Sequence, residues 1–247
     1  MEGTIFEEYS LPSKGKVYSQ PVNPEICLRS MTTEDEMKRL SHSNSQYKLL
    51  SEIIDDCLTK KIGIPAYDLC VSDYQYLLHK LRVVTYGADY PIEPICPVCG
   101  YQDETSINLD DLEVVEYDDE LSKYLNITLP VSKNKLKLRV QTPRLMDWVT
   151  KKVEELNKKT NSKSNTSAFL FTIMSLIETI DGETYDEMKL ESYVRKLDMK
   201  DTNYILQCAK KFDFGINTTI ECECPRCNSV YKANIPITEE FFRPRID

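Results

Sequence analysis

Apolar residues recur at helical spacing in two stretches of the N-terminal part of the chain. Over residues 47–60 they return every three to four positions, and over residues 72–87 they form a longer stripe that ends at Gly87. This period places them on one face of a helix, so two amphipathic helices are predicted. Thr33 and Ser72 each begin a Thr/Ser-x-x-Glu/Gln sequence, the form of a capping box at a helix start.

The pattern changes to alternation after residue 100. Apolar and polar residues alternate over 105–109, 112–115 and 136–140, which is the period of half-buried strands and predicts a small antiparallel sheet. Helical spacing returns at Thr142-Pro143, an N-cap followed by a first-turn proline, and continues in segments to about residue 214. The most apolar of these segments, 168–180, is expected to be a central helix.

Three prolines interrupt the first 28 residues, where no helical period is found. We therefore predict an extended N-terminal arm over 1–28. Its apolar residues could dock on the body of the same chain or on a neighbouring subunit, and the sequence leaves both open. The candidate partner-binding residues are Leu11, Val17 and Tyr18.

Together these patterns predict an α+β fold in four parts. The arm (1–28) leads into a helical segment (29–90), which is followed by a β-rich region formed by two separate pieces of the sequence. The two pieces are 91–142 and 215–247, and a helical block, 143–214, is inserted between them.

Composition and charge narrow the class of partner. The 247 residues are 41% hydrophobic and 29% charged, as in soluble globular proteins. The net charge of −9 and the pI near 5.0 count against nucleic acid, because neutralising phosphates requires an excess of Lys and Arg. The sequence shows no secretory leader and no apolar run long enough to span a membrane, so we expect protein partners in the cytoplasm and no membrane partner.

Two short cysteine motifs carry the clearest chemistry. Cys96 and Cys99 lie in Cys-Pro-Val-Cys-Gly, and Cys224 and Cys227 lie in Cys-Pro-Arg-Cys-Asn. Such a turn lets two thiolates converge on one tetrahedral ion, and its last residue can adopt a positive φ. Two turns supply four ligands, and each precedes a strand-like segment. The sequence therefore predicts a split zinc ribbon that holds one structural Zn²⁺.

The spacing of this ribbon is unusual. A gap of 124 residues separates the motifs, whereas common ribbons have about 15 to 20. Redox chemistry, disulfides and unligated thiols are the alternatives, although two matched motifs in β-rich surroundings favour zinc over a thioredoxin-type pair. Cys222 is an alternative ligand beside Cys224. The remaining cysteines have apolar neighbours and are expected to be buried thiols: Cys27, Cys57, Cys70 and Cys208.

Little in the sequence points to catalysis. The two histidines, His42 and His79, lie in no metal or nucleophile motif, and the seven glycines form no phosphate-binding loop. A four-thiolate ion leaves no open position for water or substrate. We therefore expect a non-enzymatic protein in which the metal stabilises the fold by joining the two ends of the helical block.

Several segments resemble one known family. They are LPSKGKVY from Leu11, LRSMTTEDEMKRLS from Leu28 and LCVSDYQYLLHKLRVVTYG from Leu69, the last followed by Tyr90. With the two Cys-Pro-x-Cys motifs, they are similar to the baseplate hub proteins of T4-like, contractile-tailed bacteriophages. The resemblance covers residues 11–117 and resumes from Gly215 to the C-terminus, leaving out the helical block between.

The resemblance implies a late viral protein of the tail baseplate hub. It would be either a resident structural subunit of the virion or an assembly factor (a chaperone), and its partners would be other baseplate hub or tape-measure proteins. Its place would be the host cytoplasm during assembly and, for a resident subunit, the virion tail baseplate. The resemblance implies no catalytic residue, and it implies that the metal ligands are Cys96, Cys99, Cys224 and Cys227.

A second function remains open from the sequence: a zinc-ribbon adaptor that binds nucleic acid or the transcription machinery. Its support is a local basic strand made of Lys133, Lys135, Lys137 and Arg139. Such a run is more often a solvated strand face, and the acidic balance of the chain counts against the adaptor.

Overall fold

The computed structural model describes residues 5–41, 43, 45–102, 104–160, 165–235 and 239–242. They form helices and small antiparallel sheets, so the predicted α+β class is confirmed. The chain divides into two compact units. Unit 1 comprises Met1–Ala66, Ser72–Glu116 and Phe214–Asp247, and unit 2 comprises Tyr67–Val71 and Tyr117–Asp213. Among the residues described, no helix is both long and apolar enough to cross a membrane.

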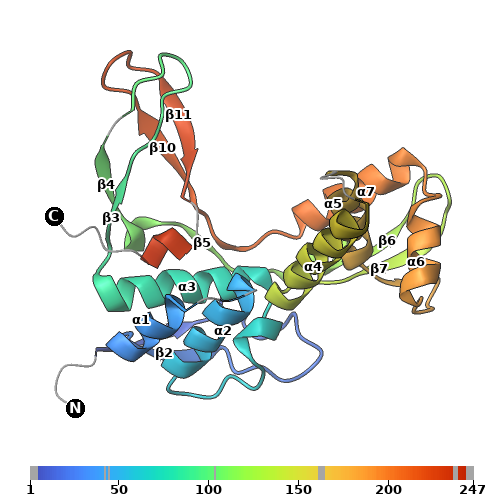
Figure 1. Cartoon of the computed structure of the whole chain (residues 1–247), viewed down its shortest axis with the longest axis horizontal. Helices are drawn as coiled ribbons and strands as arrows, with labels where there is room; N and C mark the ends of the chain where they lie inside the picture. Colours follow the sequence, from blue (N-terminus) through green and yellow to red (C-terminus); the bar gives the residue numbers. More distant parts are fainter. Residues whose placement is uncertain are drawn as a thin grey trace. The chain divides into compact units, whose positions relative to one another are not determined.

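Unit 1 combines three helices with four two-stranded antiparallel sheets among its described residues (Figure 1). The sheets pair β1 with β2, β3 with β4, β5 with β9 and β10 with β11. In chain order the elements are β1 (Phe6–Ser10), β2 (Glu25–Arg29), α1 (Thr33–Arg39), α2 (Gln46–Cys57), α3 (Val71–Tyr86), β3 (Asp89–Ile92), β4 (Thr105–Asn108), η2 (Leu109–Asp111), β5 (Val114–Val115), β9 (Gly215–Ile216), β10 (Thr219–Glu223), β11 (Val230–Asn234) and η4 (Glu239–Phe242).

Helix α3 is the centre of unit 1. Leu77 and Leu81 on its apolar stripe are fully buried, as the helical spacing predicts. Helix α2 contacts it through the rings of Tyr47 and Tyr74, whose centroids lie 6.4 Å apart. The C-terminal η4 also packs on α3, because Arg82 Nε donates a hydrogen bond of 3.1 Å to the carbonyl of Phe241. Residues far apart in the sequence thus share one core.

The N-terminal arm packs on its own unit. Strand β1 pairs with β2 along its whole length, and the following turn is held by the buried carboxylate of Asp73 on α3. Asp73 accepts hydrogen bonds from the amide of Ser13 at 3.0 Å and from the hydroxyl of Tyr18 at 2.6 Å. Gly15 adopts φ +73° in this turn. The segment that resembles the family, LPSKGKVY, is therefore fixed by a long-range contact with α3.

Unit 2 is a three-stranded antiparallel sheet covered by helices, with its own apolar core. Its strand order is β6-β7-β8, and Trp148 meets Phe171 edge to face at 5.9 Å in the core. The elements are η3 (Asp119–Tyr124), β6 (Asn126–Thr128), β7 (Lys135–Leu138), α4 (Pro143–Thr160), α5 (Asn165–Leu176), β8 (Ile177–Ile180), α6 (Glu187–Val194) and α7 (Met199–Lys211), and η1 (Ala66–Asp68) spans the boundary with unit 1.

The two ends of unit 2 lie together. Tyr117 is its first residue after the crossing from unit 1, and its ring centroid is 6.0 Å from that of Phe212. A compact unit with adjacent ends can be inserted into another without stretching it. The Tyr117–Asp213 segment is long in sequence, but its two ends are close together, so it can be inserted at one point of unit 1.

The inserted unit begins earlier than the helical block predicted over 143–214. It starts at Tyr117, because β6 and β7 pair with β8 and bury Ile127, Leu136 and Leu138 in the core of unit 2. The predicted helix over 168–180 is also shorter in the structure. Helix α5 ends at Leu176, and the next four residues form β8, which pairs with β7.

Candidate metal centre

The first cysteine motif lies at the end of the β3–β4 hairpin of unit 1. The register Asp89↔Asn108 to Ile92↔Thr105 continues to an isolated bridge between Ile95 and Gln102, and the turn follows directly. Within the turn, the amide of Cys96 donates to the carbonyl of Tyr101 at 2.9 Å, and the amide of Gly100 donates to the carbonyl of Cys96 at 2.9 Å.

The second motif closes the β10–β11 hairpin in the same way. The amide of Cys224 donates to the carbonyl of Ser229 at 2.9 Å, and the amide of Asn228 donates to the carbonyl of Cys224 at 2.8 Å. Gly100 and Asn228 adopt φ +69° and +55°, which confirms the predicted positive φ at the last residue of each turn. The two turns share one backbone design, and Figure 1 shows the hairpins side by side with their turns at the same end.

The four sulfur atoms meet between these turns. All of them lie within 4.8 Å of one another, with Cys96 Sγ 3.7 Å from Cys227 Sγ and Cys99 Sγ 3.6 Å from Cys224 Sγ. A disulfide requires about 2.05 Å. A tetrahedral ion with metal–sulfur bonds of about 2.3 Å places its sulfur ligands about 3.8 Å apart. The four cysteines could therefore hold one metal ion, and the two measured separations fit a tetrahedral site.

The site is graded from buried to exposed. Cys96 and Cys224, the first cysteine of each turn, are each 1% exposed, whereas Cys99 is half-buried and Cys227 is exposed. The inner thiols are fixed by the strand-like hydrogen bonds at the start of each turn. The outer thiols complete the cluster from the solvent side.

Ser229 is a site residue that the sequence reasoning missed. Its Oγ lies 3.2 Å from Cys96 Sγ and 3.0 Å from Cys227 Sγ, so it bridges the two motifs. This hydroxyl, with nearby backbone amides, lowers the pKa of Cys96 to about 6 and also lowers the pKa of Cys227. Metal ligation requires thiolates, so these contacts favour the ligating form. Ser229 occupies the position that Tyr101 has after the first turn, a match that could have drawn notice to it.

The pKa of Cys99 is shifted in the opposite direction, upward. The Tyr101 amide acts to lower the pKa of Cys99, but burial and the three neighbouring thiols outweigh it and raise this pKa to about 12. Several thiols at this spacing cannot all ionise unless a cation balances their charge, because like charges repel. The cluster is therefore suited to a cation.

Cys222, the predicted alternative ligand, lies outside the cluster of four. It sits on β10 opposite Tyr231, one strand pair before the turn, and it lines a cleft between the hairpins instead. The pairing with β11 fixes its position on the strand. The remaining cysteines confirm the prediction of buried thiols, since none is more than 9% exposed: Cys27, Cys57, Cys70 and Cys208.

The candidate partner-binding residues of the arm are placed on unit 1. Leu11 is 1% exposed and belongs to the core of unit 1, as expected of an arm that docks on the body of its own chain, one of the two alternatives that the sequence left open. Tyr18 is half-buried and bound to Asp73, and Val17 is half-buried. The arm is therefore an intramolecular contact in this structure.

Comparison with known proteins shows the family of the chain. The family model described as T4 bacteriophage base plate protein matches residues 4–243, which includes the inserted unit that the resemblance from sequence left out. No curated protein and no solved structure matches the chain significantly. Because the family model spans nearly the whole chain, both hairpins and unit 2 included, the chain belongs to the T4 bacteriophage base plate protein family.

Proposed function

We propose that this chain is a non-enzymatic, zinc-stabilised component or assembly factor of the baseplate hub that acts through contacts with other tail proteins. The observation that carries the proposal is the cluster of four thiols from two hairpins, found in a chain of the base plate family. The hub, rather than another part of the baseplate, rests on the resemblance of residues 11–117.

Zinc is the metal that the donor set favours. Four thiolates in a tetrahedral arrangement are typical of Zn²⁺ or of iron–sulfur centres. Two Cys-Pro-x-Cys turns, each ending in a residue with positive φ, are typical of zinc ribbons. Zinc has no redox chemistry, so its contribution in such a site is to the stability of the fold.

The hairpins explain why a metal would be needed. Each belongs to a two-stranded sheet, and an isolated two-stranded hairpin is at best marginally stable in water. One ion with two ligands from each hairpin would tie them together, and its binding free energy would become folding free energy. Unit 1 would then present a rigid pair of hairpins to its partners.

The surroundings of the described histidine support a non-enzymatic role. His79 is 1% exposed, and its Nε2 lies 3.0 Å from the carbonyl of Leu109. Burial lowers the pKa of His79 to about 4, so it is a neutral core residue at physiological pH. His42 lies outside the described residues.

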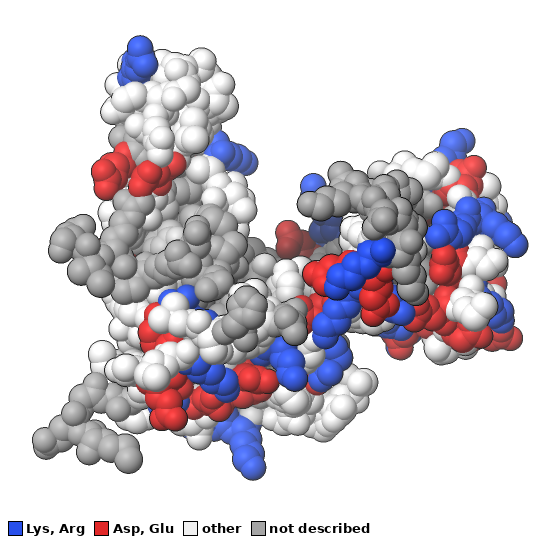
Figure 2. Space-filling model, in the orientation of Figure 1, with Lys and Arg blue, Asp and Glu red and all other residues white. Residues whose placement is uncertain are grey.

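The nucleic-acid alternative gains little from the structure. On the basic strand, Lys137 forms an ion pair of 2.9 Å with Glu178, and Lys133 Nζ donates to the carbonyl of Pro130. On the face shown in Figure 2, Lys and Arg are interspersed with Asp and Glu rather than gathered into one basic surface. A protein partner is the better-supported choice.

Elemental analysis of the purified full chain tests the metal. We expect one zinc per chain in the wild type and in a Cys222→Ser control, and none in a Cys96→Ser, Cys227→Ser double variant. Iron in place of zinc would indicate an iron–sulfur centre, and a metal-free wild type would refute the clamp.

Mass spectrometry of infected cells and of purified particles tests the place of action. Presence in both, at a fixed ratio to other baseplate proteins, would identify a resident subunit, whereas presence in cells alone would identify an assembly factor. Failure to co-purify with any tail protein from infected cells would contradict both forms of the proposal.

A further inference from the structure

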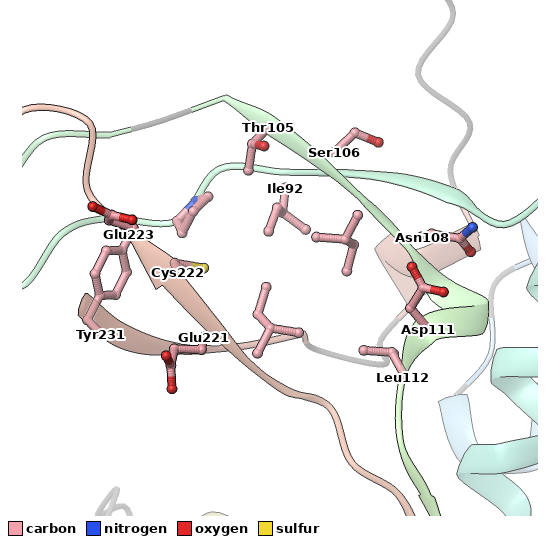
Figure 3. Close-up of a pocket in the computed structure, with 13 residues that line it drawn as sticks. Ile92, Thr105, Ser106, Asn108, Asp111, Leu112, Glu221, Cys222, Glu223 and Tyr231 are labelled. Atoms are coloured by element: carbon pink, nitrogen blue, oxygen red, sulfur yellow. The ribbon is translucent and has the colours of Figure 1, made fainter. Parts of the chain in front are cut away.

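A cleft of about 510 Å³ opens between the two hairpins of unit 1. This volume is within the range of binding sites that enclose a ligand or a short segment. Figure 3 shows Ile92 pointing into the cleft, with Asp111, Glu221 and Glu223 around it. Neither the metal cluster nor the family assignment accounts for this feature.

The cleft lies along the edges of β4 and β10. Successive side chains of a strand point to opposite faces, so a cavity touched by consecutive residues must lie at the edge of that strand. Four consecutive residues line the cleft from each of these strands, 105–108 and 220–223, whereas from β11 it is lined by Tyr231 alone. The cleft is therefore bordered by two strand edges.

The strand register shows which backbone groups face outward from these edges. In an antiparallel pair, every second residue pair exchanges hydrogen bonds, and the others direct their N–H and C=O groups away from the partner strand. The bonds from Leu109 to Ala88 and from Cys224 to Ser229 fix this alternation in each hairpin. The residues with outward-facing backbone groups are Ser106 and Asn108 on β4 and Glu221 and Glu223 on β10.

The opposite edges of the hairpins are protected. On β3 the outward-facing position opposite Ser106 is Pro91, which has no N–H group. On β11 the outward-facing position opposite Glu221 is Lys232, and a charged lysine on an edge disfavours strand addition. The edges on the cleft carry neither a proline nor a lysine among these positions, and the charges that they do carry, on Glu221 and Glu223, would repel an acidic strand but attract a basic one.

The floor of the cleft is apolar and incompletely covered. Ile92 and Ile107 from one hairpin and Ile220 from the other are half-buried. A segment placed between β4 and β10 would cover them. Apolar side chains at alternate positions of an extended segment would all point to this floor.

The charges at the cleft select the other side chains of that segment. Three carboxylates line the cleft: Asp111, Glu221 and Glu223. Within the part of the chain that the structure describes, none of them forms an ion pair. This includes Glu221, although Lys232 is its partner residue on the paired strand β11. Basic side chains on the outward face of an added strand would meet these carboxylates.

We propose that this cleft binds an extended segment of a partner protein, with aliphatic and basic residues in alternation, as a strand added to the edge of β4 or β10. Backbone hydrogen bonds to the outward-facing groups would provide affinity, and the apolar floor and the carboxylates would provide specificity. The inference goes beyond the metal-clamp role, and it places a partner contact at a cleft distinct from the thiol cluster.

The test measures peptide binding to the metal-loaded full chain by fluorescence anisotropy. The probe is a dye-labelled, amidated heptapeptide in which Lys and Val alternate. A scrambled peptide of the same composition has the same charge, and an N-methylated version lacks alternate N–H donors. We expect both to bind at least about tenfold more weakly than the probe, because strand addition requires alternation and backbone donors.

Protein variants test the carboxylates. Changing Glu221→Gln and Glu223→Gln together should weaken the probe about fivefold at low salt, from the loss of two exposed charge contacts. A matched double variant, Glu34→Gln with Glu154→Gln, removes two exposed charges elsewhere and should leave binding within about twofold. Zinc content is measured for every sample, so loss of the clamp is distinguished from loss of the cleft.

Three outcomes would overturn the proposal. Equal binding of the probe, the scrambled peptide and the N-methylated peptide would show general attraction of a cation to an acidic protein. If the two double variants weakened probe binding equally, the binding would likewise be a general attraction of a cation to an acidic protein. Self-association that is lost in the Glu221→Gln, Glu223→Gln variant, with no probe binding by the monomer, would assign the edges to a second copy of this chain.

Discussion

Removing one thiol from each hairpin, by Cys96→Ser with Cys227→Ser, should release the metal and destabilise unit 1. The perturbation leaves each turn with one cysteine, so neither hairpin can hold the ion alone. The backbone hydrogen bonds of the turns use main-chain atoms and are unchanged in the variant. The loss should therefore report the cross-link itself.

The size of the effect follows from the loop that the metal closes. If the whole chain unfolds, the ion joins points separated by the 124 residues between Cys99 and Cys224, and closing such a loop is worth about 5 kcal/mol. If unit 2 stays folded, its adjacent ends shorten the flexible part to about 27 residues, and the value falls to about 3.5 kcal/mol. For a chain of this size these values correspond to about 7 to 20 °C in Tm.

Differential scanning calorimetry of the wild type, the double variant and Cys222→Ser would measure this. The Cys222→Ser protein loses a thiol of the same hairpin outside the cluster, so its Tm should stay within a few degrees of the wild type. Adding a strong chelator to the wild type should reproduce the melting curve of the double variant. Unit 2 has its own core, so a transition from it should persist in all samples.

The reasoning would be refuted by a double variant that melts within a few degrees of Cys222→Ser while the wild type retains zinc. The ion would then be bound without clamping the hairpins. A chelator that leaves the wild-type curve unchanged after removing the zinc would lead to the same conclusion.

Two further predictions concern the rest of unit 1. Gly15→Ala should lower the free energy of unfolding by about 3 kcal/mol, because Gly15 has φ +73° and a Cβ would lie 2.5 Å from the carbonyl oxygen of Val22. Gly87→Ala should lower it by only about 1 kcal/mol, because Gly87 has a similar φ of +87° but no atom lies within 4 Å of the added Cβ. Urea unfolding measures both, and equal losses would contradict the steric argument. The hydrogen bond from Arg29 holds the pKa of Asp35 at about 2, below the ordinary value of 3.8, so the stabilisation is present above pH 4 and is lost as the pH falls toward 2. Between pH 5 and pH 3, Asp35→Asn should therefore lose about 1 kcal/mol less stability than the wild type in urea unfolding, and parallel losses would exclude the contact as the cause.

The cluster of four thiols was predictable because its sequence signal is local. Each Cys-Pro-x-Cys turn is encoded by a few adjacent residues, and the match between the turns joins them across the insertion. Ser229 was missed because the two turns were matched by their cysteines alone, and the position that Ser229 occupies holds a tyrosine, Tyr101, after the first turn. Its role depends on Cys96, which is distant in sequence and is brought near by the fold.

The helix boundaries show where local reasoning ends. The predicted capping box at Thr33 lies one residue earlier, where Thr32 pairs with Asp35. The capping form at Ser72 does not start α3, which begins at Val71, and Asp73 bonds Ser13 of the arm instead. Ile177 and Ile180 are both buried, which fits a helix as well as a strand, so periodicity could not distinguish the two structures. The segment is a strand because it pairs with β7.

The identical design of the two turns, 128 residues apart, also sets an order of events during synthesis. At about 5 to 20 residues per second, a ribosome needs roughly 6 to 26 seconds to proceed from the first turn to the second. Throughout that interval Cys96 and Cys99 lack the other two cysteines of the cluster, while Tyr117–Asp213, the larger segment of unit 2, emerges and can fold. Phe241, which packs on α3, emerges later still. The first hairpin of unit 1 is therefore made before the Tyr117–Asp213 segment and its second hairpin after it, so the four-thiol cluster can assemble only once both have emerged.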